Sequence, residues 1–118
     1  MTTTFFDVAE HRFAVSGEER ILVMMDNYKP FVTTAGDTVF SLTAEAGTAP
    51  DYSEELRQEE EGQDIICGKT PEGCPVFEFR WWNETAGWLV CAADYSEGRL
   101  VMTGSCEKLA IDNALMVL

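Results

Sequence analysis

The chain has 118 residues, of which 46% are hydrophobic, and its 21 acidic side chains against 8 basic ones give a formal charge of −13 at pH 7. The length fits one domain with an ordinary globular core. The charge argues against a nucleic-acid partner, which would need clustered Lys and Arg, and against binding to anionic membranes. Apolar runs such as 21–25 and 114–118 have only five residues, against about 20 in a membrane-spanning helix.

Short stretches in which apolar and polar residues alternate at period two recur along the chain. This alternation is typical of strands with one buried face, and Gly-containing turn signals separate the stretches. Residues 21–25 are apolar on both faces, which predicts a short strand buried on both sides. The alternating residues of the other expected strands are Phe13 and Val15; Phe40, Leu42 and Ala44; Phe77, Phe79 and Trp81; Trp88, Val90 and Ala92; and Leu100 and Met102.

The acidic segment 51–64 interrupts this pattern with seven Asp and Glu side chains, relieved by Arg57. A solvated helix turn, a loop and an edge strand all fit so charged a stretch. Calcium chelation fits less well, because the alternating Asp/Asn ligands and central Gly of a calcium loop are missing.

Residues 105–118 predict a helix. Ser105 can cap it, and Ile111, Leu115 and Leu118 share one face. The last five residues are apolar all around, so we expect this helix to pack into a groove, against a partner, or to lead into a further domain. The predicted fold is therefore mainly β, an antiparallel sheet or sandwich over residues 1–104 followed by one C-terminal α-helix.

The cysteines Cys67, Cys74, Cys91 and Cys106 are spaced too widely for a typical zinc site, and the single histidine, His11, is remote in sequence. We expect reduced packing thiols, with a disulfide and a metal site as alternatives, and no cofactor. The N-terminal residues lack the charged and apolar regions of a secretory signal. These features favour the cytoplasm.

The tripeptide Gly68-Lys69-Thr70 resembles the end of a phosphate-binding loop, but the position five residues before Gly68 is Gln63 instead of Gly. The prolines and glycine that follow disfavour the helix that such a loop must open, and they predict a hairpin turn instead. No nucleophile motif accompanies His11. We therefore expect no enzymatic activity. A small enzyme using His11 with a nearby acid or thiol remains an alternative.

Trp82 follows directly after Trp81, and successive strand residues point to opposite faces. If Phe77, Phe79 and Trp81 face inward, Trp82 faces solvent, a second layer or a partner. An exposed tryptophan can anchor a protein interface or stack on a sugar ring. Trp82 is therefore a candidate interface residue.

Several stretches resemble the region upstream of the kinase core in bacterial proteins related to HPr kinase/phosphorylase. They are Phe6-Asp7-Val8-Ala9, Asn27-Tyr28-Lys29-Pro30-Phe31, Ala86-Gly87-Trp88 and, as the most specific part, Ile111-Asp112-Asn113-Ala114-Leu115-Met116-Val117-Leu118. In that family a β-rich region leads through an apolar helix into the kinase core. The resemblance implies that the phosphate-binding loop and the catalytic residues follow Leu118, so none is carried onto this chain.

The resemblance also implies a function without catalysis. The chain would be an accessory domain that docks on the missing kinase-like domain or another protein, or mediates homo-oligomerisation, through Trp82, Ile111, Leu115 and Leu118. The alternative is a standalone small β-protein that binds a protein or a small ligand through an aromatic surface.

Overall fold

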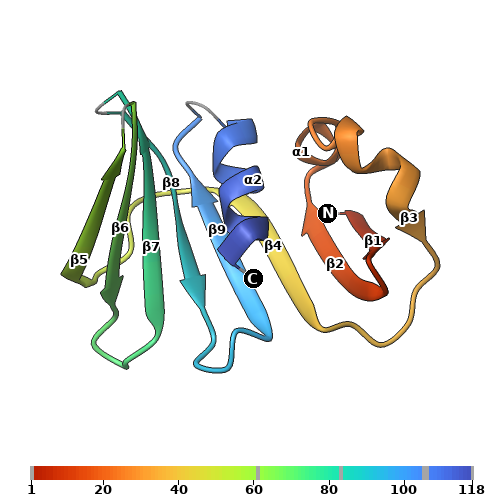
Figure 1. Ribbon diagram of the computed structural model, residues 1–118, viewed down its shortest axis with the longest axis horizontal. Helices are drawn as coiled ribbons and strands as arrows, with labels where there is room; N and C mark the ends of the chain where they lie inside the picture. The colour runs from red at the N-terminus through yellow and green to blue at the C-terminus, as the bar shows by residue number, and fades with distance from the viewer. Residues whose placement is uncertain (1, 61, 83, 105–106, 118) are drawn as a thin grey trace.

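The computed structural model describes residues 2–60, 62–82, 84–104 and 107–117. The strands in these ranges are β1 (Thr2–Val8), β2 (His11–Gly17), β3 (Val32–Thr33), β4 (Phe40–Ala46), β5 (Ser53–Glu60), β6 (Gln63–Lys69), β7 (Pro75–Trp81), β8 (Glu84–Cys91) and β9 (Glu97–Met102). The helices are α1 (Glu19–Val23), the 3-10 helix η1 (Asp26–Phe31) and α2 (Glu107–Val117). The mainly β prediction and the C-terminal helix are both confirmed (Figure 1).

All described strands belong to a single sheet with the order β3-β1-β2-β4-β9-β8-β7-β6-β5. Strands β5 to β9 form an antiparallel meander, but β4 pairs in parallel with both β2 and β9. The prediction of a purely antiparallel sheet was therefore wrong. Long connections allow parallel pairing, and β4 is separated from β2 by α1, η1 and β3, and from β9 by the first four strands of the meander.

The strand predicted at residues 21–25 was also wrong, because this stretch forms α1 and the turn after it. Ile21 and Met25 are both buried while Val23 is exposed. Residues four apart lie on the same side of a helix. Two buried positions at that spacing fit one helical turn on the sheet.

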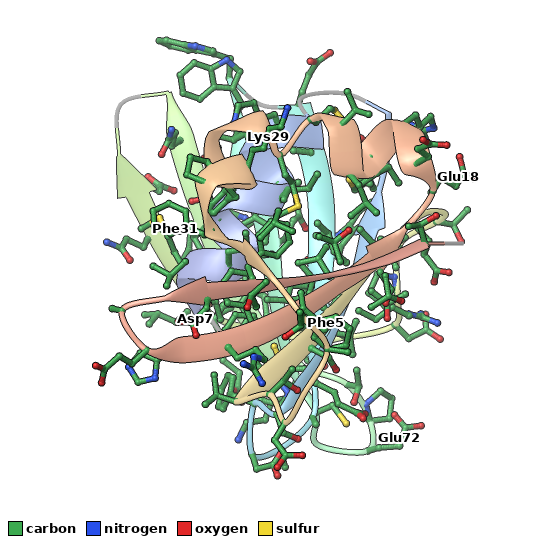
Figure 2. All side chains as sticks on the ribbon, turned by 90° about the vertical axis from the view of Figure 1, so that its right-hand side faces the viewer. Phe5, Asp7, Glu18, Lys29, Phe31 and Glu72 are labelled. Carbon is green, nitrogen blue, oxygen red and sulfur yellow. The ribbon has the colours of Figure 1, made fainter. Side chains whose placement is uncertain are left out.

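One apolar cluster fills the space between the sheet and the helices. Helix α2 lies against β8 and β9 and contributes Ala110, Ile111 and Ala114 to the cluster. At the other end, η1 and the β1–β2 hairpin close the molecule on the side that faces the viewer in Figure 2. The alternating residues of β4, Phe40, Leu42 and Ala44, lie in this cluster as predicted.

The face of the sheet opposite α2 is crossed by residues 47–52, the connection from β4 to β5 (yellow in Figure 1). The Gly47 amide donates a hydrogen bond to the Met102 carbonyl, at 3.1 Å, and the Tyr52 ring lies close to Gly68. We call this side the crossed face. It holds its own buried apolar residues, among them Val76 and Val101.

The acidic segment contains β5 and the start of β6. Since β5 is the last strand in the sheet order, the edge strand is the alternative that the structure confirms for this segment.

Candidate functional site

The interface residues predicted from the sequence lie in three different settings. Trp82, in the turn after β7, is 64% exposed, so solvent is the setting observed among the three that the sequence left open. Ile111 is 1% exposed because its face of α2 packs on the sheet of the same chain, so it is a core residue and does not contribute to a free surface. Leu115 is half-buried, and Leu118 lies outside the described residues.

Leu115 lines an apolar groove at the C-terminal end of α2, with a volume of about 590 Å³. The neighbouring Met116 is 82% exposed and lines the groove as well. The remaining walls come from the β1–β2 hairpin, η1 and the start of β4. The groove residues are Val8, His11, Phe13, Tyr28, Val39, Phe40, Leu115 and Met116.

The two-residue turn between β1 and β2 places Val8 and His11 at this groove. Both of its residues, Ala9 and Glu10, have positive φ, at 52° and 69°. Hairpin turns of this type favour Asn and Gly, and a side chain in the left-handed region costs about 1 kcal/mol per residue. Strained backbone of this kind is concentrated at functional sites.

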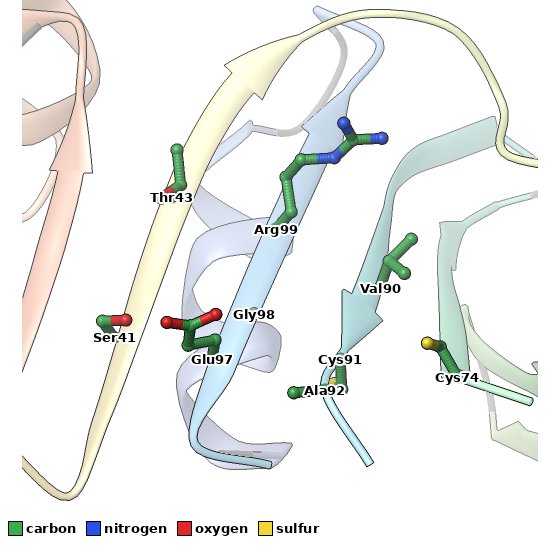
Figure 3. Close-up of a pocket in the computed structure, with 9 residues that line it drawn as sticks. All are labelled: Ser41, Thr43, Cys74, Val90, Cys91, Ala92, Glu97, Gly98 and Arg99. Carbon is green, nitrogen blue, oxygen red and sulfur yellow. The ribbon is translucent and has the colours of Figure 1, made fainter. Parts of the chain in front are cut away.

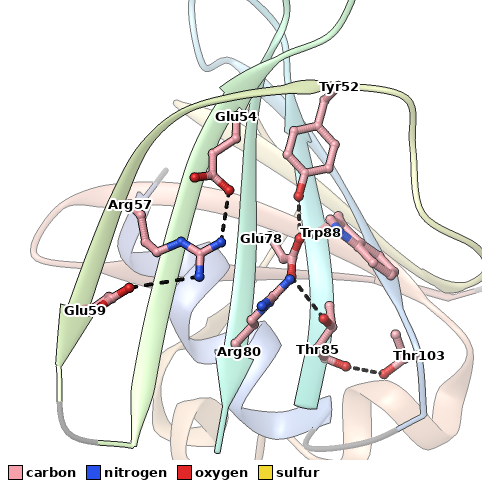
Figure 4. A network of polar contacts seen from close by, with 9 residues as sticks. All are labelled: Tyr52, Glu54, Arg57, Glu59, Glu78, Arg80, Thr85, Trp88 and Thr103. Atoms are coloured by element: carbon pink, nitrogen blue, oxygen red, sulfur yellow. Dashed lines mark hydrogen bonds and ion pairs between the residues drawn. The ribbon is translucent and has the colours of Figure 1, made fainter. Parts of the chain in front are cut away.

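Besides the groove, the structure contains a polar cluster around Glu78 on the crossed face (Figure 4). Glu78 is the buried charged residue of the described chain, and four side chains donate hydrogen bonds to its carboxylate. Thr85 Oγ1 donates to Oε2 at 3.0 Å and Trp88 Nε1 donates to Oε1 at 3.2 Å. The Tyr52 hydroxyl and Arg80 Nε are the other two donors.

These contacts shift two pKa values in opposite directions. Burial alone would raise the pKa of Glu78, but the hydrogen bonds from Tyr52, Arg80 and Thr85 and the charge of Arg80 outweigh it and lower that pKa. Burial and the bond to Glu78 raise the pKa of Tyr52 to about 12. The cluster therefore holds an ionised carboxylate and a neutral phenol at neutral pH. Each is tied to its neighbours, as expected of a structural network.

Sequence alternation placed Glu78 on the face opposite Phe77 and Phe79, and Phe79 indeed lies in the apolar cluster. The burial of Glu78 was missed, because its cover comes from Tyr52 on the crossing segment. A buried charge must be paired. The only sequence feature that could have indicated the burial of Glu78 is a single Glu between large apolar residues.

A smaller pocket of about 430 Å³ also lies on the crossed face (Figure 3). Its walls include Ser41, Thr43, Arg99 and both Cys74 and Cys91. Burial, and to a lesser degree the nearby Cys74, raises the pKa of Cys91 to about 11. A thiol with so high a pKa is protonated at neutral pH and is a poor nucleophile.

The other residues singled out from the sequence are also placed. Lys69 ends β6 and Pro75 begins β7, which confirms the predicted hairpin around Gly68-Lys69-Thr70. Cys67, Cys74 and Cys91 are free thiols, while Cys106 lies outside the described residues. The described part of the chain contains no cluster of three or more His, Cys, Asp or Glu suited to a metal ion. None of its described helices is long and apolar enough to cross a membrane.

Comparisons with protein-family models, with curated proteins and with solved structures returned no match for this chain.

Proposed function

We propose that this chain is the non-catalytic N-terminal accessory domain of an HPr-kinase-like cytoplasmic protein and acts through contacts with a protein. The observation that carries the proposal is the apolar groove at the end of α2, with Met116 extending from its rim at 82% exposure. Soluble proteins seldom leave large apolar side chains grouped around a concave surface without a partner.

The chemistry of the groove fits a protein partner. Its lining is apolar apart from His11 and Tyr28, and Val39 adds a second exposed aliphatic side chain beside Met116. In such interfaces, truncation of only a few residues near the centre of the contact usually causes a large loss of affinity. We therefore expect Met116, Val39 and Leu115 to dominate the contact.

The partner in this proposal is the kinase-like domain that the sequence resemblance places after Leu118. Its docking on the groove would cover the apolar end of α2. The charge of −13 supports a protein partner over nucleic acid.

The proposal is tested by reading the coding sequence beyond the codon for Leu118, purifying the encoded domain separately and titrating it into this chain by calorimetry. We expect binding, and a loss of at least about tenfold in affinity for Met116→Lys, since a buried lysine would lack a partner. Val23→Lys is the matched control, because Val23 is also an exposed aliphatic residue but does not line the groove. A stop codon after Leu118, or equal losses for both variants, would contradict the proposal.

A second candidate function is that of a standalone β-protein which binds a protein or small ligand through an aromatic surface. The observation that favours it is Trp82, which has a positive φ of 49° and yet is largely exposed. Such a backbone favours Gly or Asn, so packing alone does not account for a tryptophan there. If this function holds, Trp82→Gly abolishes binding of that protein or small ligand, whereas Met116→Lys leaves the binding unchanged.

A further inference from the structure

The outer edge of β5 is open in the part of the chain that the structure describes, because β5 ends the sheet order with β6 on its inner side only. On an edge strand, alternate N–H and C=O groups point away from the sheet and have no strand partner. Residues 53–59 are all exposed, and Leu56 in the middle of the strand is 65% exposed. A bulge shifts the register between Glu54 and Leu56, so regular pairing with β6 runs over residues 56–60.

The charge of this edge is negative. Arg57, the basic residue of β5, forms ion pairs with Glu54, at 3.0 Å, and Glu59, at 3.9 Å, so its charge is already shared. Glu55 adds a further exposed carboxylate. A second copy of this chain, itself at −13, is repelled by such an edge. A strand carrying Lys or Arg is attracted to it.

Trp82 extends the same surface at the end of β5. Its amide donates a hydrogen bond to the Gly62 carbonyl, at 3.0 Å, and its indole ring lies against Gly62 in the β5–β6 turn. The ring stands edge-to-face with Trp81 at 5.8 Å between centroids. An exposed indole face attracts ammonium and guanidinium groups through the cation–π interaction.

We propose that the outer edge of β5, together with Trp82, is a docking surface for an extended, Lys/Arg-rich segment of a partner protein, which pairs with β5 as an additional strand. Main-chain hydrogen bonds to residues 56–60 supply the affinity in this mode of recognition. Leu56 supplies an apolar contact. The carboxylates and the Trp82 ring select basic side chains over neutral or acidic ones. The groove at α2 has other walls, but Gln58 of β5 and Met116 of α2 line one small pocket, so the two surfaces adjoin there. Either proposal can still hold without the other.

The test uses this chain, labelled with ¹⁵N, and an end-capped eight-residue peptide of alternating lysine and valine. We expect the amide signals of residues 53–59 and the Trp82 indole signal to shift on titration. The signals of Val8 and Tyr28, which line the groove at α2 but not the pocket that Gln58 shares with Met116, should remain in place. A lysine–proline peptide has the same charge but cannot form a strand ladder, so it should bind at least about tenfold more weakly. A glutamate–valine peptide should not bind.

Two double variants control for the overall charge. E55K/E59K should remove binding of the lysine–valine peptide, whereas E19K/E72K, which makes the same charge change at exposed positions outside β5, should retain most of it. Shifts spread over the whole surface, or equal binding of the proline peptide, would overturn the proposal. So would a dimer of this chain that Leu56→Lys dissociates, because the edge would then pair with a second copy.

Discussion

The Tyr52 hydroxyl donates a hydrogen bond to the Glu78 carboxylate and so fastens the crossing segment 47–52 to the middle of β7. Thr85 and Trp88 on β8 donate to the same carboxylate, and Arg80 pairs with it from β7 itself. One buried acid thus connects two neighbouring strands and the segment that covers them.

Tyr52→Phe removes one donor from Glu78 and leaves the other three. We expect the free energy of unfolding to fall by about 1–2 kcal/mol, since hydrogen bonds to charged groups contribute more than neutral ones. Urea denaturation measures the change. Tyr95→Phe is the matched control, because no hydrogen bond of the Tyr95 hydroxyl is seen within the described residues, and its effect should stay within about 0.5 kcal/mol.

Tyr52→Phe also shows how the stability contributed by Tyr52 depends on alkaline pH. The pKa of Tyr52 is raised to about 12 in the folded protein, against about 10 in an unfolded chain. The neutral phenol is therefore favoured by folding, and this stabilisation is complete below about pH 10 and is lost as the pH rises toward 12. The difference in stability between the wild type and Tyr52→Phe should shrink over that range. A constant difference would contradict the assigned contact.

Glu78→Gln should lower the free energy of unfolding at pH 7 by about 2–3 kcal/mol, because Arg80 loses the charge of its buried partner and one amide group cannot accept all four donors. The folded pKa of Glu78 is lowered, so its stabilising effect is complete above the unfolded pKa of about 4.3 and is lost as the pH falls through the folded pKa. Wild type and variant should therefore converge in acid. Denaturation at several pH values measures this, and a difference that grows below pH ~4 would contradict it.

Helix α2 has a core side and a free side, and two truncations distinguish them. Ile111→Ala should cost about 2–4 kcal/mol, because Ile111 is fully buried in the apolar cluster. Met116→Ala should change the stability by less than about 0.5 kcal/mol. Thermal and urea unfolding of both variants provide the comparison. A cost at Met116 close to that at Ile111 would mean that Met116 is not free for a partner.

Trp82→Gly should leave stability nearly unchanged. The variant gains about 1 kcal/mol from relief of the left-handed backbone, and loses about 0.5–1.5 kcal/mol with the edge-to-face contact to Trp81. Urea unfolding followed by circular dichroism measures the balance, since fluorescence would itself change. A loss well above about 2 kcal/mol would show that Trp82 supports the fold instead of a contact surface.

The sequence predicted those strands in which apolar and polar residues alternate. It failed where consecutive residues are all apolar and no alternation is present. Phe40, Leu42 and Ala44 alternate with polar residues, and β4 follows from them. Five consecutive apolar residues at 21–25 fit a buried strand and a buried helical turn equally, and only the packing of Ile21 and Met25 distinguishes the two.

Relationships between distant segments were beyond the sequence patterns. The parallel position of β4 between β2 and β9 depends on how long connections pass over the sheet. The donors to Glu78 come from positions 52, 80, 85 and 88, which the strand register brings together. Similarly, Val8, Val39 and Met116 meet at one groove although each belongs to a separate stretch of the chain. Trp82 is exposed, but it lies in the turn after β7 with a positive φ, so strand alternation is not the reason for its exposure.

The groove is tested most directly with methyl-labelled methionine in this chain, recorded alone and with the kinase-like domain that we propose as its partner. The account predicts that the Met116 methyl signal shifts at saturation, while the signal of Met102, 1% exposed in the core, does not. A complex that forms with the Met116 signal unchanged would contradict the role of the groove, as would the absence of any complex.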